Sequence, residues 1–260
     1  MTQTPPLPAP QTMPVNGTDI AFRHIGGTPQ SGPAIVFLPG YMSDMEGSKA
    51  TAIAEWCERE GRECLLLDYS GCGSSAGAFA DGTLSRWRDE VLAVTEAQLR
   101  AERIVLVGSS MGGWLMVLAG LALGERLHAL VGIAAAPDFT DWGFDESQKA
   151  ALRSGQTVFE DSDYGHDPMP THPGFWADGE TNRVLDAPIP LTCPVRLLHG
   201  QDDAEVPPAI SLRLAAALQS ADVQVTLVKE GDHRLSRGGD VALLLHTIAA
   251  VCDAGNLQGR

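Results

Sequence analysis

Six apolar runs recur along the chain, and segments with helical periodicity separate most of them. The runs are AIVFL from Ala34, CLLLD from Cys64, IVLV from Ile104, LVGIAA from Leu130, VRLLH from Val195 and VQVTLV from Val223. Short β-branched runs of this kind are typical of strands buried on both faces of a parallel sheet. The helical patterns predict helices at roughly 49–60, 84–99, 111–123, 208–218 and 241–252. The predicted fold class is α/β, with a mostly parallel central sheet flanked by helices.

One long segment breaks this alternation. Between Asp138 and Pro190 there are eleven acidic and three basic residues and no regular strand pattern. Seven aromatic residues in the same segment argue against a pure linker. We interpret residues 138–190 as a cap over the crevice between the fifth and sixth apolar strands, and residues 15–137 and 191–260 as the core. The alternative is a surface insertion whose aromatic residues pack only among themselves.

The N-terminal segment combines a turn signal with many prolines. Asn16 and Gly17 predict the tight turn of a hairpin. Residues 1–14 hold five prolines and no Lys or Arg, so they match neither a secretory signal nor an Arg-rich transit peptide. We expect a disordered tail there and a cytoplasmic protein.

Composition excludes several classes of function. The formal net charge of −15 argues against nucleic-acid binding, which relies on Lys and Arg. No apolar run reaches the length of a membrane span. Five cysteines without a C-x-x-C pair favour reduced thiols over a disulfide framework or a zinc site. We expect no metal and no cofactor.

The clearest chemical signal is a serine flanked by glycines between a predicted strand and a predicted helix. IVLV precedes Gly108, Ser110 and Gly112, and WLMVLAGLAL follows at once. This strand-turn-helix setting is that of a nucleophile elbow, in which small residues let the strand and the helix pass closely. A second G-x-S-x-G copy centred on Ser75 leads into a loop, so Ser110 is the preferred nucleophile.

A serine nucleophile needs a histidine base and an acid, which follow it in the chain order Ser, Asp or Glu, His for this type of elbow. Asp202 and Asp203 come just after the strand VRLLH, and His233 comes just after VQVTLV. Loops at the carboxyl ends of parallel strands can converge, so these groups can meet Ser110. We prefer Asp203, with Asp202 as the alternative acid.

The other histidines are weaker candidates for the base. His199 ends a strand but precedes the acid, which is the wrong order. The remaining ones are expected to be structural or to lie in the cap, where they could touch substrate: His24, His128, His246, His166 and His172.

An acyl-transfer reaction also needs donors for the developing oxyanion. The backbone amide of Met111 follows the nucleophile directly. The second donor is expected from the glycine turn after AIVFL, as the backbone amide of Tyr41. An ordinary turn at Gly40 is the alternative.

These segments together resemble the α/β-hydrolase fold from Ile35 to Val251. Five segments more closely resemble the α/β-hydrolase domain-containing protein 10 group: FLPGYMSDMEGSKA, LLLDYSGCGSS, VGSSMGGWLM, PIPLTCPVRLLHGQDD and DHR. That resemblance implies palmitoyl-protein thioesterase or acyl-glucuronide esterase activity. Its motifs fall on Ser110, Asp203 and His233, and H-G-x-x-D-x-x-V-P favours Asp203 over Asp202. Animal members carry a mitochondrial presequence, so a bacterial relative is expected here.

The leading hypothesis is a serine hydrolase that cleaves carboxylic esters or thioesters through an acyl-enzyme on Ser110. Its partners would be a small acyl ester or thioester, or an S-acylated protein. The same triad acting on carbon–carbon or amide bonds, and a non-catalytic ligand-binding protein of the same fold, are the alternatives.

Overall fold

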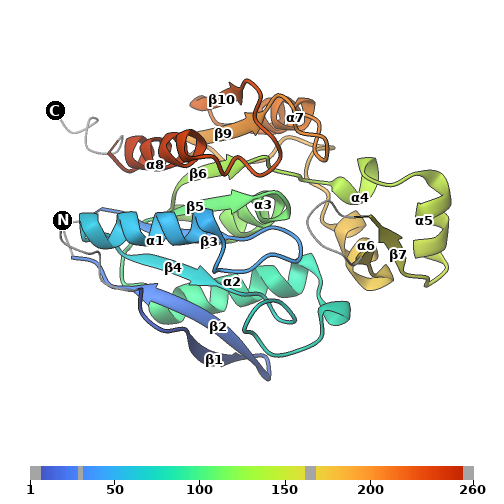
Figure 1. Cartoon of the computed structure of the whole chain (residues 1–260), viewed down its shortest axis with the longest axis horizontal. Helices are drawn as coiled ribbons and strands as arrows, with labels where there is room; N and C mark the ends of the chain where they lie inside the picture. Colours follow the sequence, from blue (N-terminus) through green and yellow to red (C-terminus); the bar gives the residue numbers. More distant parts are fainter. Residues whose placement is uncertain (1–6, 29–31, 162–167, 254–260) are drawn as a thin grey trace.

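The computed structural model describes residues 7–28, 32–161 and 168–253. Its main feature is an eight-stranded sheet (Figure 1). In this sheet the neighbouring strands β4, β3, β5, β6, β9 and β10 are all parallel, while β1 and β2 form an antiparallel hairpin beside β4. Each of the six apolar runs supplies a strand. In sheet order the strands are β1 (Gln11–Val15), β2 (Thr18–Ile25), β4 (Cys64–Leu67), β3 (Ala34–Leu38), β5 (Ile104–Ser109), β6 (Leu127–Ile133), β9 (Val195–Gly200) and β10 (Val223–Val228).

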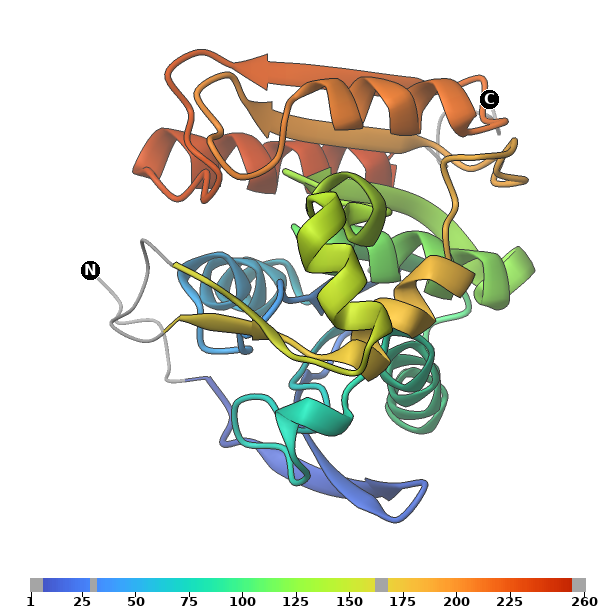
Figure 2. The same ribbon diagram turned by 90° about the vertical axis from the view of Figure 1, so that its right-hand side faces the viewer.

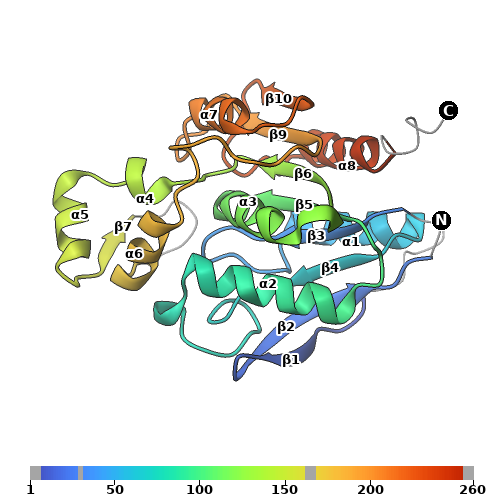
Figure 3. The same ribbon diagram turned by 180° about the vertical axis from the view of Figure 1, so that it is seen from behind.

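Helices cover both faces of this sheet, which explains why its central strands are apolar throughout. α1 (Ser48–Glu60) and α8 (Gly238–Asp253) cover one face. α2 (Leu84–Gln98), α3 (Met111–Leu123) and α7 (Ala209–Ala217) cover the other (Figure 3). The predicted helices are confirmed to within a few residues at each end. A separate hydrophobic core lies between the sheet and each helical layer.

Local chemistry sets several helix ends. The side chain of Thr83 accepts a hydrogen bond from the Arg86 amide and caps α2. Gly61 ends α1 at φ +64, a left-handed conformation that glycine adopts without strain. A short 3₁₀ helix, η1 (Phe79–Asp81), precedes α2.

The N-terminal hairpin is present, but the tail predicted up to Pro14 is wrong over residues 11–14. Gln11–Val15 form β1, and Pro14 pairs with Asp19 of β2. Asn16 and Gly17 both have positive φ, as a tight hairpin turn requires. Proline is tolerated because β1 is an edge strand that needs partners on one side only. Residues 1–6 lie outside the described part.

The cap, residues 138–190, leaves the sheet after β6 and returns at β9. It holds α4 (Phe139–Trp142), α5 (Glu146–Arg153), β7 (Val158–Glu160), β8 (Met169–Thr171) and α6 (Pro173–Thr181). Figure 2 views the molecule with these elements facing the reader. β7 and β8 form a small antiparallel sheet that the sequence pattern did not reveal. Tyr164 and His166 lie outside the described residues.

The cap extends beyond its predicted position, the crevice between the fifth and sixth apolar strands, which are β9 and β10. Phe139 and Trp142 of α4 pack beside Val206 and Ile210, which follow β9. α6 packs instead against η1 and α2, toward the other end of the sheet.

The cap aromatics do not pack only among themselves. Phe175 lies 4.9 Å from the Tyr41 ring and 5.6 Å from Trp87, and Phe139 lies 5.7 Å from Trp114. Aromatic packing therefore fixes the cap to the core.

Two features concern membrane insertion and the redox state of the cysteines. Within the described ranges, no helix has both the length and the apolar character needed to cross a bilayer. All five cysteines are free thiols, and four of them are buried: Cys57, Cys64, Cys72 and Cys252.

Phe175→Ala should lower the free energy of unfolding by about 3–5 kcal/mol, because a ring that is 1% exposed leaves a cavity between the cap and the core. Phe159→Ala is the matched control. That ring is 63% exposed, so its loss should stay within about 0.5 kcal/mol. Urea unfolding measures both; equal midpoints for the two variants would contradict this packing.

Candidate active site

Ser110 occupies a sharp turn between β5 and α3. Its φ of 54° and ψ of −121° lie in a region that non-glycine residues rarely adopt and that costs about 1–3 kcal/mol. The surrounding backbone holds it there. The Ser110 amide donates to the Ile133 carbonyl at 2.9 Å, and its carbonyl accepts from Gly113 and Ala136 at 2.8 and 3.0 Å.

The flanking glycines are required by close backbone approaches. A Cβ on Gly108 would lie 2.2 Å from the Gly112 carbonyl oxygen, and a Cβ on Gly112 would lie 2.1 Å from that of Leu38. Side chains at these positions would push the strand, the helix and the loop after β3 apart. The small residues that indicated an elbow in the sequence therefore have a steric cause.

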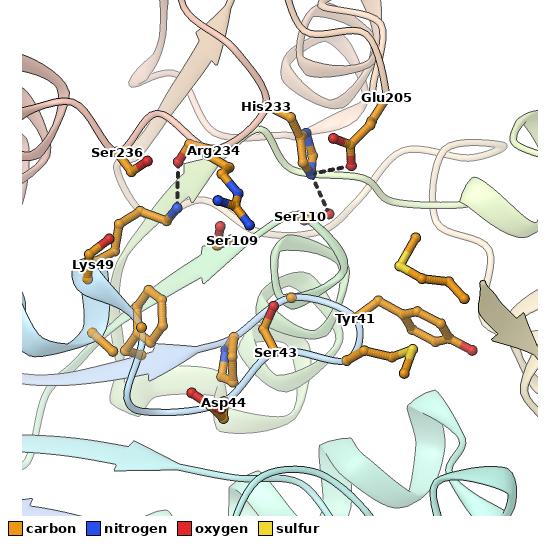
Figure 4. Close-up of a pocket in the computed structure, with 18 residues that line it drawn as sticks. Tyr41, Ser43, Asp44, Lys49, Ser109, Ser110, Glu205, His233, Arg234 and Ser236 are labelled. Carbon is orange, nitrogen blue, oxygen red and sulfur yellow. Dashed lines mark hydrogen bonds and ion pairs between the residues drawn. The ribbon is translucent and has the colours of Figure 1, made fainter. Parts of the chain in front are cut away.

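The structure brings His233 and Asp203 to Ser110 (Figure 4). His233 Nε2 is 3.0 Å from Ser110 Oγ, and His233 Nδ1 is 2.9 Å from Asp203 Oδ2. His233 follows β10 and Asp203 follows β9. A Cβ on Gly200 would lie 2.2 Å from the Gly231 carbonyl oxygen, so the two loops cross in direct contact.

The side chain of Asp203 is fully buried and contacts four hydrogen-bond donors. Oδ1 accepts from the amides of Glu205 and Val206 at 3.0 and 2.8 Å, and Oδ2 lies within reach of His233 and His199. Burial acts to raise the pKa of this carboxyl, but the hydrogen bonds from His199, His233 and Val206 outweigh it. They hold the Asp203 pKa well below its usual range, so the group is an anion at neutral pH.

His199 is the feature that sequence reasoning missed, since its position before the acid had served only to exclude it as the base. It is fully buried, and its Nε2 lies 3.1 Å from Asp203 Oδ2 and 2.9 Å from the Val206 carbonyl. Both neighbours are acceptors, so Nε2 carries the proton. Nδ1 pairs with the Ser211 hydroxyl at 2.7 Å. The H-G-x-x-D spacing was the available signal.

The alternative acid and nucleophile take other places. Asp202 is exposed, and its amide donates to the Gly231 carbonyl. The Ser75 hydroxyl donates to the Asp68 carbonyl at 2.7 Å and accepts from the Ala21 amide at 2.8 Å. Ser75 thus ties its loop to β2.

Three other histidines have partners away from Ser110. His24 contacts Glu63 at 3.0 Å, and His128 contacts the Val251 carbonyl. His172 precedes α6 in the cap and pairs with Thr157.

The expected oxyanion donors lie on either side of Ser110. Met111 is the first residue of α3, and the amides of a helix's first turn have no partner within the helix. Tyr41 follows the Gly40 turn. Its ring points away from Ser110, and its hydroxyl donates to the Pro170 carbonyl in the cap at 2.9 Å. The Tyr41 side chain is thus occupied, which leaves the backbone amide as its donor.

A pocket of about 700 Å³ opens at Ser110. Its lining includes His233, Glu205, Lys49, Arg234 and Met169. Among the described residues, no group of His, Cys, Asp or Glu is arranged to hold a metal ion.

Comparison with known proteins identifies the family. Residues 89–250 match the model of the prolyl oligopeptidase family. The protein named palmitoyl-protein thioesterase ABHD10, mitochondrial, from Mus musculus is 40% identical over 240 residues, 90% of this chain and 79% of that protein. The solved mouse α/β hydrolase domain-containing protein 10 superposes with a TM-score of 0.85 and 38% identity, covering 95% of this chain and 99% of that one. The chain belongs to the ABHD10 family of α/β hydrolases.

A putative hydrolase from Agrobacterium vitis S4 is also similar, with a TM-score of 0.87 and 35% identity over 95% of this chain and 100% of that chain. The resemblance found in the sequence and the α/β-hydrolase fold with its mostly parallel sheet are therefore confirmed. The protein is a hydrolase.

His199→Leu should raise the pKa of the Asp203 carboxyl, because one of the donors that stabilise its ionised form is lost. In ¹³C-aspartate NMR, Asp203 should begin to protonate at a higher pH in the variant than in the parent. His24→Leu is the control, because His24 pairs with Glu63 instead. An unchanged titration would mean that the His199 N–H serves only the Val206 carbonyl.

Proposed function

We propose that the protein is a serine hydrolase that cleaves carboxylic esters or thioesters through an acyl-enzyme on Ser110. The observation that carries the proposal is that His233 bridges Ser110 Oγ and the buried carboxylate of Asp203 at 3.0 and 2.9 Å. This arrangement suits transfer of the serine proton to an imidazole whose tautomer is fixed from the other side. The turn at Ser110 supports it by holding the hydroxyl in the pocket.

The chemistry follows from these positions. Ser110 Oγ attacks the acyl carbon while His233 Nε2 takes the hydroxyl proton, and the Tyr41 and Met111 amides stabilise the oxyanion. The bond to the leaving oxygen or sulfur breaks as His233 returns that proton. Water then attacks the acyl carbon and gives one proton to His233. The bond between the acyl carbon and Ser110 Oγ breaks, the carboxylic acid leaves, and His233 returns the proton to Ser110 Oγ. Asp203 holds the imidazole throughout and stabilises its charged form.

The substrate class is supported by the relatives. The mouse relative is named a palmitoyl-protein thioesterase, so we propose acyl thioesters, including S-acylated proteins, beside simple esters.

The five free thiols favour a reducing compartment, for which we propose the cytoplasm; the relative's name places that protein in the mitochondrion. Hydrolysis rates for matched esters, thioesters and amides over a series of acyl lengths test the reaction class. Preference for the amides would favour the peptidase chemistry suggested by the prolyl oligopeptidase family match.

Ser110→Ala should abolish covalent labelling by a fluorophosphonate probe, since among the described serines it is the Ser110 hydroxyl that lies within hydrogen-bond distance of His233. Ser75→Ala is the matched G-x-S-x-G control and should label normally, because the Ser75 hydroxyl bonds only to backbone groups of Asp68 and Ala21. In-gel fluorescence after normalisation to folded protein gives the answer. Labelling that persists without Ser110 would place the nucleophile elsewhere.

Asp203→Asn should reduce turnover by on the order of 10⁴-fold, because a neutral amide favours the wrong imidazole tautomer and does not stabilise the imidazolium. Asp202→Asn should retain activity within a few fold, as Asp202 is exposed. Initial rates on one thioester compare the two. The assignment of the acid fails if Asp202→Asn is the more damaging change.

A further inference from the structure

A second carboxylate lies beside Nε2 of His233, the nitrogen that accepts the serine proton in the proposed mechanism. Glu205 Oε2 is 3.7 Å from His233 Nε2, the nitrogen that faces Ser110 Oγ. The Glu205 side chain is 38% exposed and lines the pocket. Figure 4 shows its carboxylate directed at His233 from the loop after β9. Asp203 contacts the other ring nitrogen, Nδ1. The proposed mechanism gives Asp203 a role and gives none to Glu205.

The position of His233 Nε2 determines where a leaving group lies. This nitrogen has to return its proton to the leaving sulfur or oxygen, which requires a separation of about 3 Å. Because Glu205 Oε2 contacts this same nitrogen, the carboxylate lies within about 7 Å of the leaving atom. A charge two or three bonds along the leaving group would experience this carboxylate at short range.

Other charged residues of the described pocket lining lie elsewhere around Ser110. Lys49 donates a hydrogen bond to the Arg234 carbonyl, and both residues belong to the pocket lining. Figure 4 places this pair across Ser110 from Glu205, with Asp44 on the side of the loop after β3. Charge of opposite sign thus flanks the serine. A leaving group near His233 faces the carboxylate, and another part of the substrate faces the cations.

We propose that Glu205 is a specificity-determining residue that favours leaving groups with a positive charge close to the scissile bond. The inference rests on the proposed acyl transfer from Ser110. Its substrates would be esters or thioesters of alcohols or thiols that bear an ammonium or guanidinium group. An S-acylated cysteine next to Lys or Arg has this chemistry. A unit charge on the substrate about 7 Å from the Glu205 carboxylate, with an effective dielectric constant of about 40, corresponds to roughly a five- to tenfold effect on rate.

The test uses three octanoyl thioesters that differ only in leaving-group charge. The thiols are 2-(trimethylammonio)ethanethiol, its neutral isostere 3,3-dimethylbutanethiol and the anionic 2-mercaptoethanesulfonate. We measure kcat/KM, because it includes the step in which the thiol leaves, whereas deacylation is common to all three. Each value is divided by the rate of hydroxide-catalysed hydrolysis of the same thioester, which removes differences in intrinsic reactivity.

For the parent enzyme, the normalised kcat/KM should rise by roughly five- to tenfold per unit of positive charge, from anionic to neutral to cationic. Glu205→Gln keeps the size of the side chain and should bring the three values to within about twofold. Asp202→Asn removes one negative charge from the same loop without contact to His233, so it should keep the parent's selectivity. The parent's ratios should shrink at high salt, as Glu205 is partly exposed.

The outcomes separate the two proposals. Turnover with a flat charge series in the parent, or an equal loss for all three thioesters in Glu205→Gln, overturns the selectivity inference and leaves the hydrolase proposal standing. In the second case Glu205 would act only by positioning His233. Absence of turnover with every thioester and ester would instead remove the proposed function itself.

Discussion

The whole site depends on one backbone constraint, the strained turn at Ser110. A serine at positive φ is held there only because its own amide and carbonyl are bonded to the neighbouring β6 loop and to α3. Such strain persists where the surroundings determine the conformation from several sides. Two glycines supply the space: Gly112 lets α3 touch the end of β3, and Gly108 lets it touch β5. The same contacts set the loop after β3, and hence Tyr41, beside the serine.

The parallel sheet brings the other residues of the site close to the turn at Ser110. Because β3, β5, β9 and β10 are parallel, the loops after them all leave from one edge. The residues proposed as nucleophile, oxyanion donors, acid and base are therefore neighbours although they are up to 192 residues apart in the chain, from Tyr41 to His233. The crossing of the Gly200 and Gly231 backbones then fixes the acid relative to the base.

Sequence reasoning succeeded where the determinants are local. Apolar runs and glycine spacing are properties of a few consecutive residues, so the strands, the main helices and the elbow could be predicted. The hairpin of β7 and β8 could not, because three residues per strand are too few to show an alternating pattern. The hairpin turn was predicted, but the extent of β1 was missed, because its prolines favoured a disordered tail over residues 11–14. The contacts of His199 and Glu205 were missed because they exist only once β9, α7 and the β10 loop are packed together.

Net charge is a poor guide to the field at this pocket. Several acidic groups of the cap are hydrogen-bonded to backbone amides. Asp138 accepts from the amides of Val184 and Leu185 within the cap, and Asp178 accepts from the amide of Ser85 in α2 of the core. Arg183 also contacts Asp141 at 3.0 Å, along with other carboxylates of the cap. These charges support the cap's architecture, and ion pairing reduces their effect at a distance. Besides Asp203, the carboxylate that contacts His233 in the described part of the chain is Glu205, from the core loop after β9. Selectivity by charge is therefore expected from one residue in contact with His233, and the acidity of the insertion above it matters less.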